Sequence, residues 1–336
     1  MWIRGLSFPL FSLQLGIILA HVTSPLHSEK PIIAIVGPTA SGKSELAIRM
    51  ALRFRGEIIN CDSVQVYREI EIATAKVPFE ERCGVAHHLI DFVPPEVNYT
   101  AGDWARACVE KIEEIERRGH LAFLVGGTGF YLRALRHPFF PSQPTNENLR
   151  RRLTEIRERH GAEHLHKMLR KLDPASASKL YPRDWPRVQR ALEVLFQTGR
   201  AFSEQQPARP APHESAARIH VLALNPPRAE LYKGINARTE THFNAGLVDE
   251  VRTLLERGVP AESSALGSHG YRRVVESLRG QRTLASAIEQ TKLDVRHYAK
   301  RQITWFRREP GVVWFDGFGT EARVQQQVAE YIERQK

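Results

Sequence analysis

The segment from Gly37 to Ser44 reads Gly-Pro-Thr-Ala-Ser-Gly-Lys-Ser and matches the pattern G-x-x-x-x-G-K-[ST] at every fixed position. The apolar run 31–36 precedes it, and residues 44–54 follow it with apolar side chains at helical spacing. In a strand–turn–helix of this kind, successive backbone N–H groups point into one concavity, and the helix N-terminus adds partial positive charge. The sequence therefore predicts a loop that binds a diphosphate or triphosphate. Its residues are Gly37, Pro38, Thr39, Ala40, Ser41, Gly42, Lys43 and Ser44.

Within this loop, two side chains carry specific chemistry. Lys43 supplies a full positive charge to the phosphates, and Ser44 offers a hydroxyl as a ligand for Mg²⁺. Taken alone, such a loop is equally typical of ATP-binding kinases, ATPases and GTPases.

Further apolar runs at 57–61, 121–125 and 219–224 predict buried strands, and residues 104–118 predict an amphipathic helix that ends at Gly119. Alternation of strands and helices is typical of a parallel sheet with helices on both faces. We therefore predict an α/β fold: a P-loop NTPase-like parallel sheet with helices on both faces and a mainly helical insert domain. After residue 224, we expect only helices.

Proline-rich stretches at 138–144 and 207–212 enclose a basic segment with a helical pattern. This composition predicts a core made of residues 31–137 and 216–336, with an insert at 138–215. Residues 1–30 form an N-terminal extension, in which a basic residue precedes a mostly apolar run. That pattern is typical of a signal peptide or an organellar presequence, and it also arises from a start assigned too far upstream.

The formal net charge of +10 favours a polyanionic partner such as nucleic acid or polyphosphate. The three cysteines, Cys61, Cys83 and Cys108, form no C-x-x-C pair, which is typical of a reducing compartment without structural disulfides. The adjacent His87 and His88 lack cysteine or acidic partners at ligand spacing, so we interpret them as loop or surface histidines rather than metal ligands.

One feature separates this chain from nucleotide hydrolases. Those enzymes usually carry an aspartate at the end of a second apolar strand to hold the metal, whereas residues 121–125 here run into Gly126-Gly127-Thr128. The strand at 57–61 is followed by Asp62, which could serve chemistry instead. Two alternatives remain open: a small-molecule kinase with Asp62 as the base, and a nucleic-acid-binding module whose loop is a relic.

Several segments together resemble one family, the bacterial-type tRNA dimethylallyltransferases (isopentenyl-tRNA transferases). In chain order, they are Gly37–Ser44, Asp62-Ser-Val-Gln-Val-Tyr-Arg68, Thr74-Ala-Lys76, His87-His-Leu-Ile-Asp91, Val125-Gly-Gly-Thr-Gly129, Arg187-Val-Gln-Arg-Ala-Leu-Glu193, Gly270-Tyr271 and Lys300-Arg-Gln-Ile-Thr-Trp-Phe-Arg307. Many families share the phosphate loop, but the Asp-Ser-x-Gln-x-Tyr and Lys-Arg-Gln-x-Thr-Trp segments are specific to this family. The sequence departs from the family at Ala73, where glycine is common, and at Ser268-His269, where an apolar pair is usual.

The resemblance implies a reaction. The loop would bind the diphosphate of dimethylallyl diphosphate, and the acceptor would be N6 of the adenosine 3′ to the anticodon (tRNA position 37) in tRNAs that read codons beginning with U. Asp62 corresponds to the family's general base, Arg238 to a diphosphate-binding arginine, and Thr128 to a residue that touches the nucleotide. The sequence also allows a structural role for each of the three. Asp62 could cap the strand end or contact a water bound to magnesium, Arg238 could be a solvated helix arginine, and Thr128 could cap the next helix.

The resemblance also implies contacts with the tRNA anticodon stem-loop. The corresponding residues are Asp62, Ser63, Val64, Gln65, Thr128, Arg150, Pro186, Arg187, Val188, Gln189, Arg190, Gly267, Ser268, His269, Gly270, Tyr271, Arg272, Lys300, Arg301, Gln302, Ile303, Thr304, Trp305, Phe306 and Arg307. In the last segment, we expect contact mainly from the cations and partial burial of the apolar residues. Expected partners are thus tRNA and dimethylallyl diphosphate with Mg²⁺, and we expect a cytoplasmic, monomeric protein that does not bind membranes.

Overall fold

The computed structural model describes residues 30–139, 146–205 and 210–336. Its centre is a six-stranded parallel sheet with strand order β3-β2-β4-β1-β5-β6. The strands are β1 (Ile32–Val36), β2 (Gly56–Asn60), β3 (His87–His88), β4 (Leu121–Val125), β5 (Ile219–Asn225) and β6 (Val312–Asp316). The predicted N-terminal extension at 1–30 lies outside the described residues, apart from Lys30.

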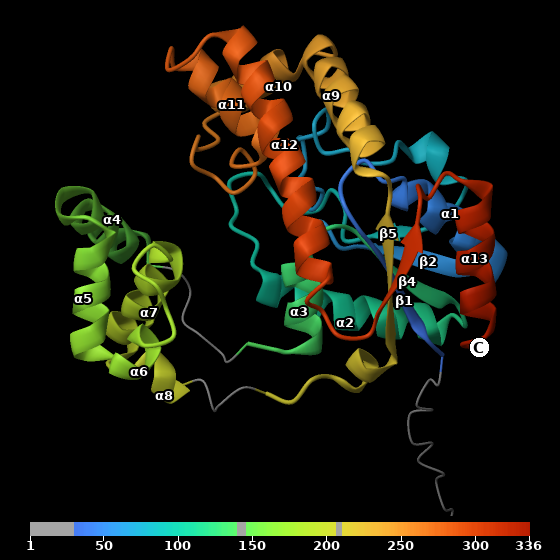
Figure 1. The fold of residues 1–336 in the computed structure, drawn as a ribbon, viewed down its shortest axis with the longest axis horizontal. Helices are drawn as coiled ribbons and strands as arrows, with labels where there is room; N and C mark the ends of the chain where they lie inside the picture. Colours follow the sequence, from blue (N-terminus) through green and yellow to red (C-terminus); the bar gives the residue numbers. More distant parts are fainter. Residues whose placement is uncertain (1–29, 140–145, 206–209) are drawn as a thin grey trace, which may run out of the picture.

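The two faces of the sheet have separate cores, because neighbouring residues of a strand point to opposite sides. Ile33 and Ile35 of β1 pack against α1 (Lys43–Phe54) and α13 (Ala322–Glu333). Ile32 and Ala34 instead face the side of α2 (Ala101–Arg117) and α3 (Gly129–Arg136). Figure 1 shows α1 and α13 beside the sheet at the right, with α2 and α3 below its opposite face. The predicted parallel α/β sheet with helices is confirmed.

One strand was missed by the sequence analysis. We expected only helices after residue 224, but residues 312–316 form β6, which pairs in parallel with β5. β6 is an edge strand, and all but one of its residues are partly or fully exposed. Its first four residues, Val312 to Phe315, are nevertheless β-branched or aromatic, so a strand signal was present in the sequence and the analysis overlooked it.

The C-terminal helices lie above the carboxyl edge of the sheet (Figure 1). They are α9 (Arg228–Asn244), α10 (Leu247–Glu256), α11 (His269–Leu278) and α12 (Leu284–Phe306). Leu231 and Ile235 of α9 pack against Ala299 of α12. Leu247 of α10 and Val274 of α11 belong to the same core as α2. The carboxyl edge, where parallel α/β folds bind ligands, is therefore roofed by helices.

The segment between β4 and β5 contains a group of helices with its own apolar core, set beside the sheet in Figure 1. They are α4 (Glu147–His160), α5 (Ala162–Leu172), α6 (Pro174–Ala177), α7 (Trp185–Thr198) and α8 (Phe202–Gln205). Leu153, Leu165 and Leu192 are among the buried residues of this core. Asp173 ties its end together by accepting hydrogen bonds from Ser176 and Ser203.

A buried carboxylate at the start of β2 makes stability depend on pH. Glu57 accepts two hydrogen bonds from Arg118, at 2.8 and 2.7 Å, and lies 2.6 Å from ring nitrogens of both His88 and His120. The Arg118 bonds, helped by the two histidines and opposed by burial, lower the pKa of Glu57 to about 2 from 4.5. The stabilisation is therefore fully present above pH 4.5 and is lost as the pH falls towards 2.

We expect Glu57→Gln to remove on the order of 3 kcal/mol of acid-dependent stability, since each pKa unit corresponds to about 1.36 kcal/mol. The measurement is urea unfolding at pH 6 and pH 3 for wild type and variant. The difference between the two proteins should shrink at pH 3. If the free energies of unfolding of the two proteins differed equally at both pH values, the negative charge of Glu57 would not contribute to stability.

Candidate active site

Two cavities of about 670 Å³ each meet at the carboxyl edge of the sheet. Their linings have six residues in common, which come from the phosphate loop, the end of β2, the segment before β3, and α9. These are Thr39, Ala40, Asp62, Thr74, Ala75 and Arg238. Beyond these shared walls, the first cavity is lined by the rest of the loop and α1, and the second by aromatic and histidine side chains.

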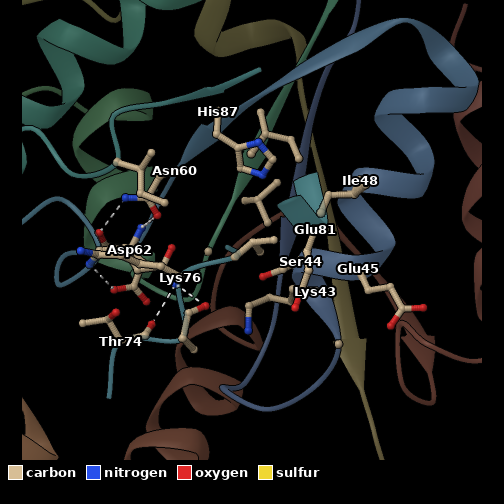
Figure 2. Close-up of a pocket in the computed structure, with 18 of the residues that line it drawn as sticks. Lys43, Ser44, Glu45, Ile48, Asn60, Asp62, Thr74, Lys76, Glu81 and His87 are labelled. Atoms are coloured by element: carbon tan, nitrogen blue, oxygen red, sulfur yellow. Dashed lines mark hydrogen bonds between the residues drawn. The ribbon is translucent and has the colours of Figure 1, made fainter. Parts of the chain in front are cut away.

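The phosphate loop has the shape that its glycines permit. Gly42 has a φ of +81°, and Ala40 also lies in the left-handed region at +62°. Behind the loop, Gly319 donates its N–H to the carbonyl of Ser41 at 2.9 Å. Lys43 reaches back to the carbonyl oxygen of Pro38 at 2.5 Å. The loop is therefore preformed around the first cavity, and Figure 2 shows Lys43 and Ser44 along its wall.

Lys43 lies in a strongly perturbed electrostatic setting. Burial lowers its pKa from 10.5 to about 8; the nearby Asp62 carboxylate acts in the opposite direction, and Arg238 adds to the lowering. A desolvated cation favours binding of a polyanion, since a phosphate would replace the solvation that the cation has lost.

Asp62 faces Lys43 across the first cavity and also lines the second (Figure 2). Its Oδ1 accepts the backbone N–H groups of Val64 at 2.9 Å and Gln65 at 3.4 Å. Burial raises the pKa of Asp62, while these hydrogen bonds and Lys43 act against the rise. The side chain thus caps the turn after β2 with one oxygen, and its raised pKa makes it a better proton acceptor than an exposed aspartate.

Asn60 holds Asp62 in place, and the sequence analysis gave it no role. Its amide accepts the N–H of Asp62 at 3.0 Å and donates to the carbonyls of Asp62 at 3.1 Å and Leu89 at 2.9 Å. Trp104 of α2 in turn donates to the Asn60 carbonyl at 2.7 Å. The available signal was a polar side chain at the end of a predicted buried strand, two residues before the candidate base.

Arg238 and Thr128 complete the junction. Arg238 extends from α9 into the lining of both cavities, where its side chain remains exposed to solvent while partial desolvation lowers its pKa. Thr128 stands before α3, but within the described residues its side chain makes no cap hydrogen bond. Instead, its hydroxyl accepts the N–H of Ser63 at 3.0 Å and thereby joins the β4 end to the turn after β2.

The second cavity is suited to a flat, uncharged group. Its lining includes aromatic rings from five elements or loops: Tyr67, Tyr99, Phe130, Tyr131, Phe243 and Tyr298. Two histidines, His242 and His269, also line it. Burial and the nearby Arg238 lower the pKa of His242 to about 4, so this ring is neutral at physiological pH.

Comparison with known proteins shows the family to which the chain belongs. A family model described as IPP transferase matches residues 65–309, and one described as isopentenyl transferase matches residues 30–91. The tRNA dimethylallyltransferase of Solibacter usitatus is 47% identical over 296 residues, covering 88% of this chain and 96% of that protein. The corresponding protein of Geobacter metallireducens is 44% identical, covering 85% and 92%. This chain belongs to the IPP transferase family.

Solved structures of IPP transferases show the same fold. The tRNA isopentenylpyrophosphate transferase of Bacillus halodurans superposes with a TM-score of 0.67 at 36% identity, covering 92% of this chain and 97% of that one. A eukaryotic dimethylallyltransferase acting on tRNA superposes with a TM-score of 0.71 at 29% identity, covering 91% and 80%. The resemblance inferred from the motifs is confirmed, and the chain is an enzyme, a prenyltransferase.

Part of the sequence-predicted RNA set lies around the second cavity of this IPP transferase. Ser63, Val64 and Thr128 line it, together with residues 267–270. Lys300, Ile303 and Thr304 of α12, with Arg307 directly after it, instead line a separate cavity of about 590 Å³. Arg228 and Tyr232 of α9 also line this cavity. The set therefore divides between two sides of α12. Arg272, Arg301 and Arg187 are exposed.

Several other members of that set are buried. Val188, Gln189, Tyr271, Gln302 and Phe306 each expose 4% of their surface or less. In the insert, Arg150 makes a two-pronged pair with the fully buried Glu193, which Arg190 also contacts. Pro186 is exposed in the first turn of α7, while Trp305 packs partly buried under the Arg133 guanidinium. The buried members have packing roles here, which the motif pattern alone does not show.

Gln302 illustrates such a role. Its Oε1 accepts the N–H of Thr39 in the phosphate loop at 2.8 Å, and its Nε2 donates to the carbonyl of Gly127 at 3.0 Å. A Cβ on Gly127 would lie 1.9 Å from that Nε2, so glycine is required there. The α12 helix is thereby fastened to both the loop and the end of β4.

The loop residues fit a magnesium ion. Ser44 lies in the first turn of α1 and lines the first cavity, and the buried Ser41 hydroxyl has no hydrogen-bond partner among the described residues. Mg²⁺ prefers oxygen ligands and usually takes few from the protein, the others coming from phosphates and water. The part of the chain that the structure describes contains no group of three or more His, Cys, Asp or Glu side chains placed to hold a metal.

None of the described helices is both long enough and apolar enough to cross a lipid bilayer.

Proposed function

We propose that this enzyme transfers a dimethylallyl group from dimethylallyl diphosphate to N6 of the adenosine at tRNA position 37, in tRNAs that read codons beginning with U. One observation carries the proposal: a phosphate-binding cavity and an aromatic cavity meet at Asp62 and Arg238. A donor that ends in a diphosphate suits the first cavity, and a flipped base suits the second. The family and its tRNA-modifying members support the assignment.

On the donor side, the phosphate loop binds the diphosphate. Charge builds on the diphosphate as the C–O bond to the dimethylallyl carbon breaks, and preorganised donors stabilise it. Lys43 and Arg238 are cations that line this cavity, and residues 40–44 of the loop line it as well. Mg²⁺, held in part by Ser44, would add positive charge at the phosphates.

On the acceptor side, the adenine stacks among the aromatic rings of the second cavity and presents its exocyclic amine to Asp62. This amine is a weak nucleophile, because its lone pair is delocalised into the ring. As the C–N bond forms, Asp62 accepts one N6 proton, and the diphosphate leaves with the electron pair of the broken C–O bond. The raised pKa of Asp62 supports this role.

An adenosine in a stacked loop must leave the stack to reach the cavity, so the enzyme must bind the surrounding RNA. The net charge of +10 and the arginines of α4, among them Arg151 and Arg152, support a role for the insert in holding the anticodon stem-loop. We place the reaction in the cytoplasm, where its RNA substrate resides, and propose a monomer as the active unit.

The direct test is single-turnover incubation of the full chain with labelled dimethylallyl diphosphate, Mg²⁺ and an anticodon stem-loop carrying adenosines at positions 36, 37 and 38. We expect label in the RNA, and none when position 37 is guanosine. A stem-loop without label, accompanied by ATP turnover, would assign the phosphate loop to a kinase instead.

A further inference from the structure

The segment from Glu71 to Ala75 forms a common wall of the two cavities. Thr74 and Ala75 line both of them, and Ala73 lines the aromatic one. The segment is irregular, with Ala75 in the left-handed region at a φ of +59°. An irregular wall keeps its shape only if other parts of the chain hold it.

The side chain of Glu250, from α10, holds the beginning of this wall. Its carboxylate accepts the backbone N–H of Glu71 at 3.2 and 3.3 Å and that of Ile72 at 3.2 Å. The same carboxylate accepts the hydroxyl of Tyr271. A carboxylate that accepts several N–H and O–H donors makes charge-assisted hydrogen bonds, which are roughly twice as strong as neutral ones.

Tyr271 extends the network by one residue. Its hydroxyl oxygen accepts the N–H of Ala73 at 3.4 Å, and its side chain is fully buried. Next to it, a Cβ on Gly270 would lie 3.3 Å from the Ala73 side chain, so α11 packs directly against the wall. Three consecutive N–H groups of the wall are thus held by α10 and α11.

The other end of the wall is held by the sheet side. The Gln65 amide donates to the carbonyls of Thr74 at 3.0 Å and Ala75 at 3.2 Å. Gln65 follows directly on the turn that Asp62 caps. The wall is therefore held between the turn after β2 and the helices α10 and α11.

We propose that Glu250 and Tyr271 are positioning residues, which set the Thr74–Ala75 wall between donor and acceptor and so fix the approach of the adenine to the dimethylallyl carbon. The kinetic test of this positioning role rests on the proposed function, because it measures dimethylallyl transfer. Neither side chain lines either cavity, so both act through the backbone of residues 71–73.

The test compares Glu250→Ala, Glu250→Gln, Tyr271→Phe and the double variant Glu250→Ala/Tyr271→Phe. In single-turnover transfer at saturating substrates, we expect Glu250→Ala to be ~10-fold slower and Tyr271→Phe a few-fold slower. Glu250→Gln should recover part of the rate, because its amide oxygen still accepts from the wall. The rate of the double variant should lie within about 2-fold of the rate of Glu250→Ala, because both changes break the same hydrogen-bond network.

Arg257→Ala is the matched control. Arg257 pairs with Glu69, just before the same wall, but both side chains are about half exposed. We expect its transfer rate to change less than about 2-fold, as is usual for exposed pairs. Wild-type rates in both Glu250→Ala and Tyr271→Phe, or an equal loss in Arg257→Ala, would overturn the proposal.

A second measurement needs no transfer activity. Hydrogen exchange of a peptide spanning residues 69–77 should be at least ~10-fold faster in Glu250→Ala, with peptides from β1 and α13 unchanged. Unchanged exchange at 69–77 would overturn the positioning role even if transfer is normal. Faster exchange in a chain whose wild type transfers nothing would uphold the wall contacts and reject the proposed function alone.

Discussion

Replacing Asp62 with asparagine is expected to slow single-turnover transfer by at least ~100-fold without lowering the stability of the protein. Asparagine keeps an oxygen for the N–H groups of Val64 and Gln65, so the turn after β2 stays capped. What it loses is the ability to accept the amine proton. The readouts are the transfer rate with labelled donor and the unfolding temperature of the same preparation.

The stability half of this prediction follows from the direction of the pKa shift. Burial raises the pKa of Asp62 in the folded state, so folding favours the protonated carboxyl, and this contribution is lost as the pH rises through the folded-state pKa. Asparagine does not ionise at this site, so the variant avoids the free-energy cost that desolvation places on the ionised aspartate. A variant that transfers at the wild-type rate would discard Asp62 as the base, while a variant that is inactive and much less stable would assign it a structural role.

Lys43→Ala is expected to lower kcat/KM for the donor by ~100- to 1,000-fold, the usual cost of removing a group that stabilises developing charge. The partly buried ammonium lies in the phosphate loop opposite Asp62, so its loss removes positive charge where the diphosphate leaves. The measurement is single-turnover transfer across a range of donor concentrations. Much of the loss should appear in the rate at saturation, because the charge on the leaving group grows in the transition state.

Arg49→Ala provides the control for Lys43. Arg49 also lines the first cavity, but it is exposed and paired with Glu45 four residues earlier on α1. We expect less than about a 2-fold change in kcat/KM. Equal losses in both variants would mean that the cavity attracts the donor by its general positive charge, and not through Lys43.

The sequence predicted the parts of this fold in which one short segment determines its own structure. β1 and β4 are five-residue apolar runs that lie buried on both faces, and the phosphate loop follows from its glycines. β6 was missed although Val312 to Phe315 is a run of β-branched and aromatic residues, which favours a strand in any segment of this length. Strand order is set by contacts between distant segments.

The sequence could predict those residues of the candidate site whose role depends on neighbours within one short motif. Asp62 and Lys43 belong to compact motifs, and the structure places both at the cavity junction. Gln302 and Tyr271 also belong to motifs, but their partners, Thr39 and Ala73, lie 263 and 198 residues away. No pattern within one segment reveals that such residues face inward to brace the site rather than outward towards RNA.

The bond between Gln302 and Thr39 bears on how the protein is made. The phosphate loop emerges early from the ribosome, yet the side chain that fixes it, and the β6 and α13 segments that complete the sheet and its outer face, are synthesised last. The nascent chain therefore carries an unbraced loop and an incomplete sheet edge through most of translation, while the insert can form its own core much earlier. A chain that stops before α12 would keep the phosphate loop and α1 but would lack the side chain that joins the loop to α12.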